Sequence, residues 1–309
     1  MPAESSPIPL IDLNTSPSVA ELGERILKAE STIGFLFLRL PQDGGLSQAH
    51  VNRVFAITRE LSDSPLEERQ ACANDEDRNG YIGYGKNRLA ESVGAGDLKE
   101  NFTYGRHPEH VAGTRQPLPP VLATHRRELD AFHAACWDLT LIARHGARAQ
   151  LPQGYLRERH ARGCNGLTLI NYPAVAPGQV ADEVAQAASS RASEHKDWGS
   201  LTLLFQEEDG TPGLEVFLPD ELVGASKADK ALELMEDVDL SHGQWHAAPI
   251  ISGTVLVNLG LAVEAWTSGV LRATLHRVTV QPDAYGGLRA RKSVPYFVQP
   301  RDQLPLVRA

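Results

Sequence analysis

Cysteine is scarce in this sequence, and its scarcity excludes two common kinds of site. The 309 residues include only three cysteines, at positions 72, 136 and 164, an odd number with no C-x-x-C spacing. Small secreted domains rely on paired cysteines, and structural zinc sites usually need closely spaced thiolates. We therefore expect neither a disulfide framework nor a zinc-thiolate site, and we predict a reducing, cytoplasmic compartment.

Long apolar runs and clusters of positive charge are also missing. No stretch of 18 apolar residues occurs, and the segment MPAESSPIPLIDL has no basic region followed by an apolar one, so neither a membrane span nor a signal peptide is predicted. The formal net charge is -9, and the largest basic group comprises Arg289, Arg291 and Lys292. Nucleic-acid surfaces normally carry clustered Lys and Arg. The expected partner is a small molecule, and the sequence leaves the oligomeric state open.

The first 150 residues alternate strand and helix patterns. Hydrophobic residues make up 42% of the chain, enough to bury a sizeable core. The runs IPLIDL (8–13) and GFLFLRL (34–40) are typical of strands, with an amphipathic helix between them. Helices are also predicted over 47–72 and over about 120–151, where apolar residues recur at helical spacing. This pattern predicts an N-terminal α/β region, residues 1–150, that packs on the rest of the chain.

Short β-rich runs dominate after Gly163, separated by Gly, Pro, Asn and Asp. These runs are GLTLINYP, SLTLLFQ, GLEVFL, GTVLVNLG, ATLHRVTVQP and KSVPYFV. They predict a sandwich or barrel over residues 151–309, joined to the first region in one structural unit. Two polar interruptions, 181–191 and 224–244, could be rim or lid segments, or solvated loops without a role.

A candidate metal-binding pair, His195-Lys196-Asp197, directly precedes the run SLTLLFQ. Residues two apart on a strand face the same side, so an imidazole and a carboxylate would both point into a barrel. A single H-x-D motif is nearly a chance event in a chain with 11 histidines. The pair therefore needs a third ligand from elsewhere in the sequence.

His276 is the candidate third ligand, because strand alternation in ATLHRVTVQP places it on the inward face with Val278 and Val280. The alternative is a core histidine bonded to a backbone carbonyl. Two imidazoles and one carboxylate on one side of an ion form the facial triad of non-haem iron(II) oxygenases, which leaves positions open for a cosubstrate and O2. We therefore predict a metal site made by His195, Asp197 and His276, which zinc could also occupy.

A possible carboxylate clamp lies fifteen positions beyond His276, in the run RKSVPYF. Arg291 and Ser293 share one face of the expected strand. Arginine offers a rigid bidentate fork for a carboxylate and serine adds a donor, as the far end of a dicarboxylic acid would need. Arg289 has the same parity and could serve in a shifted register, and a surface salt bridge is the alternative role for either arginine.

The order of these motifs resembles the 2-oxoglutarate and iron dependent dioxygenase superfamily, in the branch that includes isopenicillin N synthase. The resemblance covers nearly the whole chain. It rests on IPLIDL, GFLFLRL, GYIGYG and DLKENFTYG in the first half, and on LTLINYP, DWGSLTLLFQEEDGTPGLEVF and VNLG in the second. It implies a mainly β fold with flanking helices, built around a double-stranded β-helix, which is a cupin-like jelly roll.

The resemblance also implies an enzyme that uses Fe(II), 2-oxoglutarate and O2. Such an enzyme hydroxylates, desaturates or cyclises a small organic molecule, and secondary metabolism is the expected setting. By this likeness Arg291 and Ser293 would hold the far carboxylate of 2-oxoglutarate, and Tyr172 would hydrogen-bond it or serve as a core aromatic. The chain departs from the branch in two places. Leu261 stands where an acidic residue is usual. The asparagine that usually precedes the Tyr-Pro pair is displaced, so that Asn171 directly adjoins Tyr172. Both departures bear on the fine structure around the site.

The candidate substrate contacts are aromatic: Phe102, Tyr104 and Trp198, each of which could instead belong to the core. Two other histidine groups are weaker metal candidates. His107-Pro108-Glu109 has no strand pattern, and His242 and His246 lie where Gly243 and Pro249 favour a loop. 

Two other functions remain open at this stage. One is an iron oxidase of the same fold that takes all its electrons from the substrate, and the Arg-x-Ser pair argues against it. The other is a non-catalytic barrel that binds a small molecule, which a complete ligand triad disfavours.

Overall fold

The computed structural model of the chain describes residues 6–15, 18–42, 45–73, 79–86, 97–105, 116–144, 150–161, 164–179, 190–220, 240–279 and 283–301. Most of the two interrupting segments, 181–191 and 224–244, lies outside the described residues. The motif from His107 to Glu109 lies outside them as well.

The strands form two sheets, the larger with eight strands in the order β1-β2-β10-β7-β12-β5-β4-β3. Its strands are β1 (Leu10–Asp12), β2 (Phe35–Arg39), β3 (Gly80–Ile82), β4 (Glu100–Tyr104), β5 (Gly166–Tyr172), β7 (Leu201–Gln206), β10 (Thr254–Leu259) and β12 (Arg291–Val298). Only β1 and β2 pair in parallel within this sheet. Strands from the first 105 residues thus extend both edges of a sheet whose centre comes from the second half of the chain.

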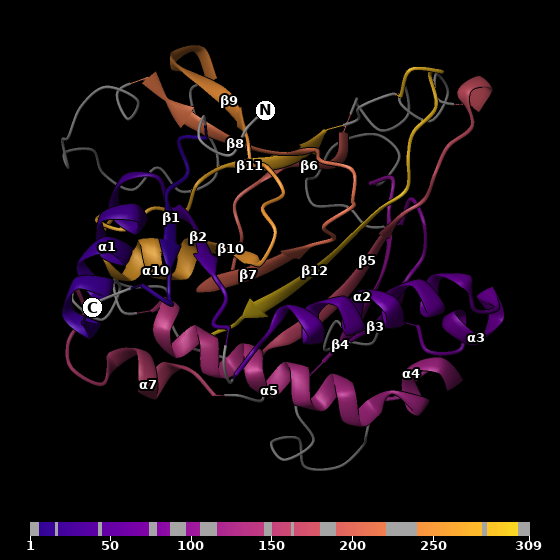
Figure 1. The fold of residues 1–309 in the computed structure, drawn as a ribbon, viewed down its shortest axis with the longest axis horizontal. Helices are drawn as coiled ribbons and strands as arrows, with labels where there is room; N and C mark the ends of the chain where they lie inside the picture. Colours follow the sequence, from indigo (N-terminus) through magenta and orange to yellow (C-terminus); the bar gives the residue numbers. More distant parts are fainter. Residues whose placement is uncertain are drawn as a thin grey trace.

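The smaller sheet has four described strands in the order β6-β11-β8-β9. They are β6 (Ser190–His195), β11 (His276–Thr279), β8 (Leu214–Pro219) and β9 (Gly243–Ala247). The expectation of a loop around His246 was wrong, because His246 lies in strand β9, opposite Val216 of β8. Figure 1 shows this sheet on one side of the large sheet, with α2 and α5 on the other side.

Helices cover the opposite face of the large sheet and its left-hand edge (Figure 1). They are α1 (Val19–Thr32), α2 (Gln48–Asp63), α3 (Leu66–Gln70), α4 (Pro120–Thr124), α5 (Arg126–Ala143), α7 (Tyr155–Arg159) and α10 (Leu261–Trp266), with short 3-10 turns η4 (Pro177–Gln179) and η5 (Leu240–His242). The Ser18 side chain accepts the backbone N–H of Glu21 and thereby caps α1.

Two helices expected as continuous are each divided in the structure. The segment 47–72 breaks after Asp63, where Ser64 takes an extended conformation before Pro65, as the residue before a proline usually does. The segment 120–151 divides at His125 into α4 and α5, and α5 ends at Ala143. The positions of both helical segments were predicted correctly, but their continuity was not.

Alternation along the strands gives the large sheet two buried faces. On β4, β5 and β12 the residues Phe102, Leu169 and Tyr296 face the helices and join the main hydrophobic core. Ile170 and Tyr172 face the small sheet, where they pack in a second, smaller core with β8 and β11 residues such as Val216. The space between the two sheets is therefore the one that the predicted metal ligands enter.

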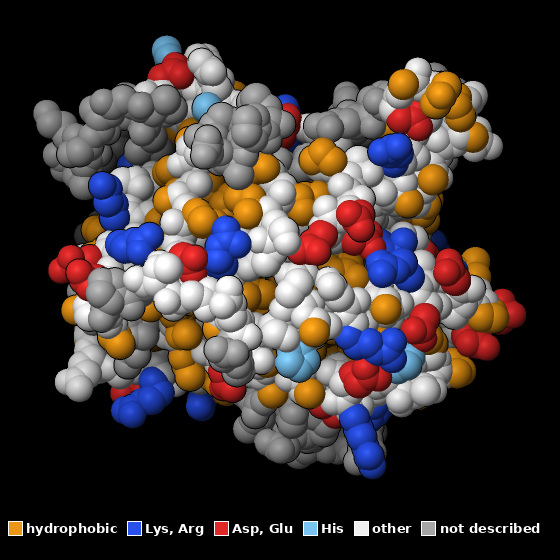
Figure 2. Space-filling model, in the orientation of Figure 1, with side chains coloured by type: hydrophobic (Ala, Val, Ile, Leu, Met, Phe, Trp, Pro, Cys, Tyr) orange, Lys and Arg blue, Asp and Glu red, His pale blue; other side chains and the backbone are white. Residues whose placement is uncertain are grey.

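Charged side chains on one face of the molecule are not segregated by sign. Acidic and basic side chains are interspersed over the face shown in Figure 2. Among the helices that the structure describes, none combines the length and apolarity needed to cross a bilayer.

Candidate metal centre

The three predicted metal ligands converge at one end of the space between the sheets. His195 ends β6, and His276 begins β11 directly opposite it in the antiparallel pair. One ligand atom from each of His195, Asp197 and His276 lies within 4.8 Å of the other two. The Oδ1 atom of Asp197 is 3.6 Å from Nε2 of His195 and 3.7 Å from Nε2 of His276. Two donors about 2.1 Å from one ion would be roughly 3.0–3.4 Å apart, so a modest adjustment completes the site.

Asp197 reaches this position by a different route from the one expected. Strand β6 ends at His195, so Asp197 lies in the turn before β7 rather than on the same strand face. Its backbone carbonyl accepts the N–H of Leu261 at the start of α10. Leu261, one of the two departures from the family pattern, therefore contacts the metal loop through its backbone, while its side chain is buried.

The second carboxylate oxygen of Asp197 is held by two polar side chains. Oδ2 accepts the hydroxyl of Thr202 at 2.5 Å and the amide of Asn258 at 2.8 Å. Both donors come from the large sheet, from β7 and β10. They orient the carboxylate so that Oδ1 faces the two imidazoles, which is the usual task of residues around a metal ligand. Sequence reasoning missed both, because only the register of β7 and β10 brings them beside Asp197.

Each imidazole is oriented by a backbone carbonyl two residues before it. Nδ1 of His195 lies 2.7 Å from the carbonyl of Ser193, and Nδ1 of His276 lies 3.0 Å from that of Thr274. Nδ1 therefore donates to a carbonyl in each ring, and Nε2 is the nitrogen that faces Oδ1 of Asp197. The ring of Phe35 packs edge-on against His276, with centroids 5.4 Å apart.

The protonation states suit a divalent cation. Burial and the neighbouring His195, opposed by Asp197, lower the pKa of His276 to about 4. Burial alone would raise the pKa of Asp197, but His276, His195 and the hydrogen bond from Thr202 hold it well below its usual value. At neutral pH the site thus presents one carboxylate and a neutral His276, the forms that bind metal.

The predicted carboxylate clamp is also assembled on the inner face of the large sheet. Arg291 and Ser293 lie on β12 with the same parity, and a guanidinium nitrogen of Arg291 donates to Oγ of Ser293 at 3.2 Å. Tyr172 lies directly opposite Arg291 on β5, and the guanidinium carbon is 4.9 Å from its ring centroid. All three predicted cosubstrate residues therefore meet at one place.

Arg291 is a buried cation without an internal counter-charge. It is 3% exposed, and none of the described carboxylates lies within 4.0 Å of its guanidinium. Burial lowers its pKa, opposed by Tyr172, yet a guanidinium stays protonated in proteins. A buried charge is costly unless it is paired. The arrangement calls for an anionic ligand that brings its own carboxylate.

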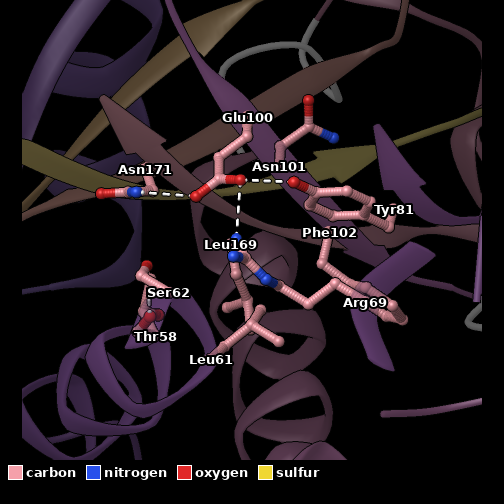
Figure 3. A pocket seen from close by; sticks show the side chains of 10 residues that line it. All are labelled: Thr58, Leu61, Ser62, Arg69, Tyr81, Glu100, Asn101, Phe102, Leu169 and Asn171. Atoms are coloured by element: carbon pink, nitrogen blue, oxygen red, sulfur yellow. Dashed lines mark hydrogen bonds and ion pairs between the residues drawn. The ribbon is translucent and has the colours of Figure 1, made fainter. Parts of the chain in front are cut away.

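The helix-facing side of the same sheet carries a polar cluster whose buried carboxylate, Glu100, finds its cation and its donors within the protein. Glu100 accepts from Arg69 at 2.7 Å, from the hydroxyl of Tyr81 at 2.5 Å and from the amide of Asn171 at 2.9 Å (Figure 3). The cavity beside it measures only about 10 Å³, room for about one water molecule. Asn171, the second departure from the family pattern, thus belongs to this cluster and not to the metal centre.

The aromatic residues predicted to contact substrate are not brought to the site. Phe102 and Tyr104 point toward the helices and pack in the main core, and the Tyr104 hydroxyl donates to Asp130 at 2.5 Å. Trp198 adjoins Asp197 but is 63% exposed. The parity of β4 instead places Asn101 and Thr103 on the inner face, opposite Ile170 and Thr168. Alternation along β4 shows that Phe102 and Tyr104 share a face with Glu100. Which of the two faces is the inner one depends on how β4 pairs with β5, and the sequence alone does not show this pairing.

Comparison with known proteins identifies the family. Residues 8–146 match the profile described as "non-haem dioxygenase in morphine synthesis N-terminal", and residues 164–300 match that of the "2OG-Fe(II) oxygenase superfamily". The chain belongs to the 2-oxoglutarate and iron(II) dependent oxygenase superfamily. The fold of the chain is accordingly the double-stranded β-helix. The enzymes of this superfamily use Fe(II), 2-oxoglutarate and O2.

Individual members of the superfamily match over most of their length. A UPF0676 protein of Schizosaccharomyces pombe is 29% identical over 306 residues, which cover 97% of this chain and 84% of the relative. The 2-oxoglutarate-dependent dioxygenase frbA of a Dothideomycetidae species is 27% identical, with 92% and 82% covered. A Neurospora crassa protein, solved with alpha-KG and thymine, superposes with a TM-score of 0.74 at 25% identity, covering 96% of this chain and 87% of that one. The chain is thus a 2-oxoglutarate-dependent non-haem iron dioxygenase that oxidises a small molecule.

Proposed function

We propose that His195, Asp197 and His276 hold the iron(II) of this dioxygenase, and that Arg291, Ser293 and Tyr172 hold 2-oxoglutarate. The observation that carries the proposal is the pairing of two incomplete sites on one inner face. Three ligand atoms converge with the donor set that a divalent cation needs, and the buried guanidinium of Arg291 has no carboxylate within 4.0 Å among the described residues. Fe(II) and a dicarboxylate would complete both.

Each residue has a defined task in this proposal. Thr202 and Asn258 fix the rotamer of Asp197 through Oδ2, so that Oδ1 and the two Nε2 atoms occupy one side of the ion. Arg291 would form a bidentate pair with the far carboxylate, and the hydroxyl of Ser293 would donate a further hydrogen bond. The iron–2-oxoglutarate pair supplies activation of O2 for attack on a C–H bond. The protein supplies geometry, orientation and exclusion of water.

The substrate is proposed to be a small organic molecule of secondary metabolism. Relatives named for such chemistry include the proline hydroxylase buaE and a validamycin A dioxygenase. Hydroxylation, desaturation and ring formation all follow from the same abstraction of hydrogen, and placement of the substrate decides among them. Two alternatives are an iron oxidase that needs no 2-oxoglutarate and a non-catalytic binding barrel. The unpaired Arg291 weighs against the first, and the complete triad weighs against the second.

The two sequence regions, 1–150 and 151–309, are proposed to act as one unit. Strand β2 pairs with β10, and β4 pairs with β5, so each sheet edge joins the two regions. The cysteines also fit the proposed cytoplasmic setting, because all three lie among the described residues and none of them forms a disulfide.

Succinate release tests the proposed cosubstrate and metal. Protein loaded anaerobically with Fe(II) is mixed with O2 and 2-oxoglutarate, with and without candidate substrates, and succinate is quantified. We expect release that requires both Fe(II) and 2-oxoglutarate. His276→Ala should lower it by more than about 100-fold, because loss of a ligand exceeds the 10- to 100-fold typical for a residue behind a ligand.

The exposed His50 of α2 provides a matched control for the histidine substitution. His50→Ala should keep both Fe(II) binding and succinate release. Full activity of His276→Ala would refute the triad, whereas substrate oxidation at an undiminished rate without 2-oxoglutarate would favour the oxidase alternative.

A further inference from the structure

A buried ion pair lies between the two sheets, just before strand β4. The ammonium of Lys99 is 2.9 Å from Oδ2 of Asp97, and the two side chains are only 6% and 3% exposed. The neighbouring Glu100 points the other way, into the cluster under the helices. Adjacent residues in extended backbone face opposite sides, so Lys99 shares the inner face with Asn101.

The surroundings of this pair place it between the proposed iron and 2-oxoglutarate sites. Asp97 accepts the backbone N–H and the hydroxyl of Ser193, each at 3.2 Å, and Ser193 is two residues before His195 on β6. Glu100 pairs with Asn171 on β5, so Lys99 lies one strand from Tyr172. The pair thus contacts the metal strand on one side and borders the proposed cosubstrate strand on the other.

The two members of the pair differ in how well their hydrogen bonds are satisfied. Asp97 has two donors on Oδ1 and the cation beside Oδ2. The ammonium of Lys99 has three N–H groups, and Asp97 is the one carboxylate near it among the described residues. Even that contact is electrostatic rather than directional, because Oδ2 makes no hydrogen bond. A buried ammonium normally directs its donors at oxygen acceptors.

We propose that Lys99, held in place by Asp97, binds a carbonyl or carboxylate oxygen of the substrate that this dioxygenase oxidises. The inference rests on the proposed function, because it takes the iron and 2-oxoglutarate sites as given. Asp97 neutralises the cation before substrate binds and fixes it against β6. A substrate oxygen would then fill the donors that Asp97 does not use. Lys99 is thereby a specificity-determining residue that selects against substrates with an amine at this position.

The test uses ligands that share one skeleton and differ in the group offered to Lys99. Cyclohexanecarboxylate, cyclohexanecarboxamide and cyclohexylmethylamine are added separately to the anaerobic protein loaded with Fe(II) and 2-oxoglutarate. Binding is followed by the change that substrate causes in the iron to 2-oxoglutarate charge-transfer absorbance. We expect carbonyl compounds to bind at least tenfold more tightly than their amine partners.

The variant Lys99→Met/Asp97→Asn removes the pair without leaving a lone buried charge. Its affinity for the carbonyl compounds should fall about 10- to 100-fold, as expected for a hydrogen bond to a charged group. Its affinity for 2-oxoglutarate, read from the same absorbance, should stay within about twofold. The matched control, Arg69→Met/Glu100→Gln, removes the buried pair on the other side of the sheet and should leave the preference for carbonyl compounds intact.

Each other result contradicts the inference in a distinct way. Equal binding of carbonyl compounds by the double variant and the original protein would refute it, as would a wild-type protein that binds none of them. A parallel loss of 2-oxoglutarate affinity would assign Lys99 to the cosubstrate instead. Absence of the charge-transfer absorbance in the wild-type protein would refute the proposed cosubstrate site, a failure separate from that of Lys99.

Discussion

The two faces of the large sheet both bury charged side chains, but they treat them differently. Under the helices, Glu100 is matched by Arg69 and by two further donors within the protein. Between the sheets, Arg291 is as deeply buried and has only Ser293 and Tyr172 beside it. Burial of charge therefore does not by itself mark a functional site. A buried cation with no carboxylate partner among the residues that the structure describes does.

Histidines repeat the same contrast. His160 is bonded at both ring nitrogens, with Nδ1 2.6 Å from the carbonyl of Leu156 and Nε2 2.8 Å from Oγ of Ser200. His276 has a carbonyl at Nδ1 and only the other candidate ligands around Nε2. A structural histidine uses both nitrogens within the fold, and a ligand keeps one for an ion.

Removing Arg69 from the cluster around Glu100 should have the largest effect on stability. Arg69→Met leaves Glu100 buried beside Tyr81 without its cation, and we expect a loss of about 3–5 kcal/mol in the free energy of unfolding, measured by urea denaturation. Added Glu100→Gln should restore much of this loss, because no lone charge remains. An Arg69→Met protein as stable as the original would contradict the structural role of the pair.

Removal of the Arg291 cation should not lower the stability of the ligand-free protein, in contrast to removal of Arg69. Arg291→Met removes a buried charge that none of the described carboxylates pairs with, so the protein without cosubstrate should be at least as stable as the original. Its affinity for 2-oxoglutarate should fall by roughly 30- to 5000-fold, the equivalent of about 2–5 kcal/mol for a truncated buried charge pair. Thermal shifts with and without 2-oxoglutarate measure both effects. Marked destabilisation of the ligand-free variant would mean that Arg291 has a structural partner after all.

His160 gives a smaller effect that depends on pH. Burial lowers its pKa to about 4, whereas an unfolded histidine titrates near 6.5. Below pH 6.5 the unfolded chain takes up a proton that the folded chain refuses, so stability falls between pH 6.5 and 4 and is unaffected above. At pH 5 the loss amounts to about 2 kcal/mol. His160→Gln should be less stable at pH 7 but should lose less between pH 7 and 5, and an unchanged slope would exclude His160 as the source.

Residue order and strand parity were enough to predict the ligand triad and the clamp. His276 with Val278, and Arg291 with Ser293, keep the faces that alternation assigned to them. Asp197 was predicted for a partly wrong reason, since a turn and not the strand face delivers it. The roles proposed for these residues await the experiments above.

Relations between distant strands could not be predicted from one sequence. Thr202 and Asn258 become partners of Asp197 only through the register of β7 against β10. The error in Phe102 and Tyr104 has the same origin, because an aromatic residue on a doubly buried sheet is equally at home on either face. Asp97 and Lys99 lie in the run DLKENFTYG that carries the resemblance, but their burial was not predicted, since charges close together in sequence usually form a solvated surface.

The contact between Phe35 and His276 has a consequence for folding during synthesis. The two rings are in contact although 241 positions separate them in the sequence. Strand β2, which carries Phe35, pairs with β10, which is synthesised much later. A chain emerging from the ribosome therefore keeps β2 without that neighbour until nearly five sixths of the sequence has been made. Iron should enter only at the end of this process, so metal supply would act on the finished fold and not on its early steps.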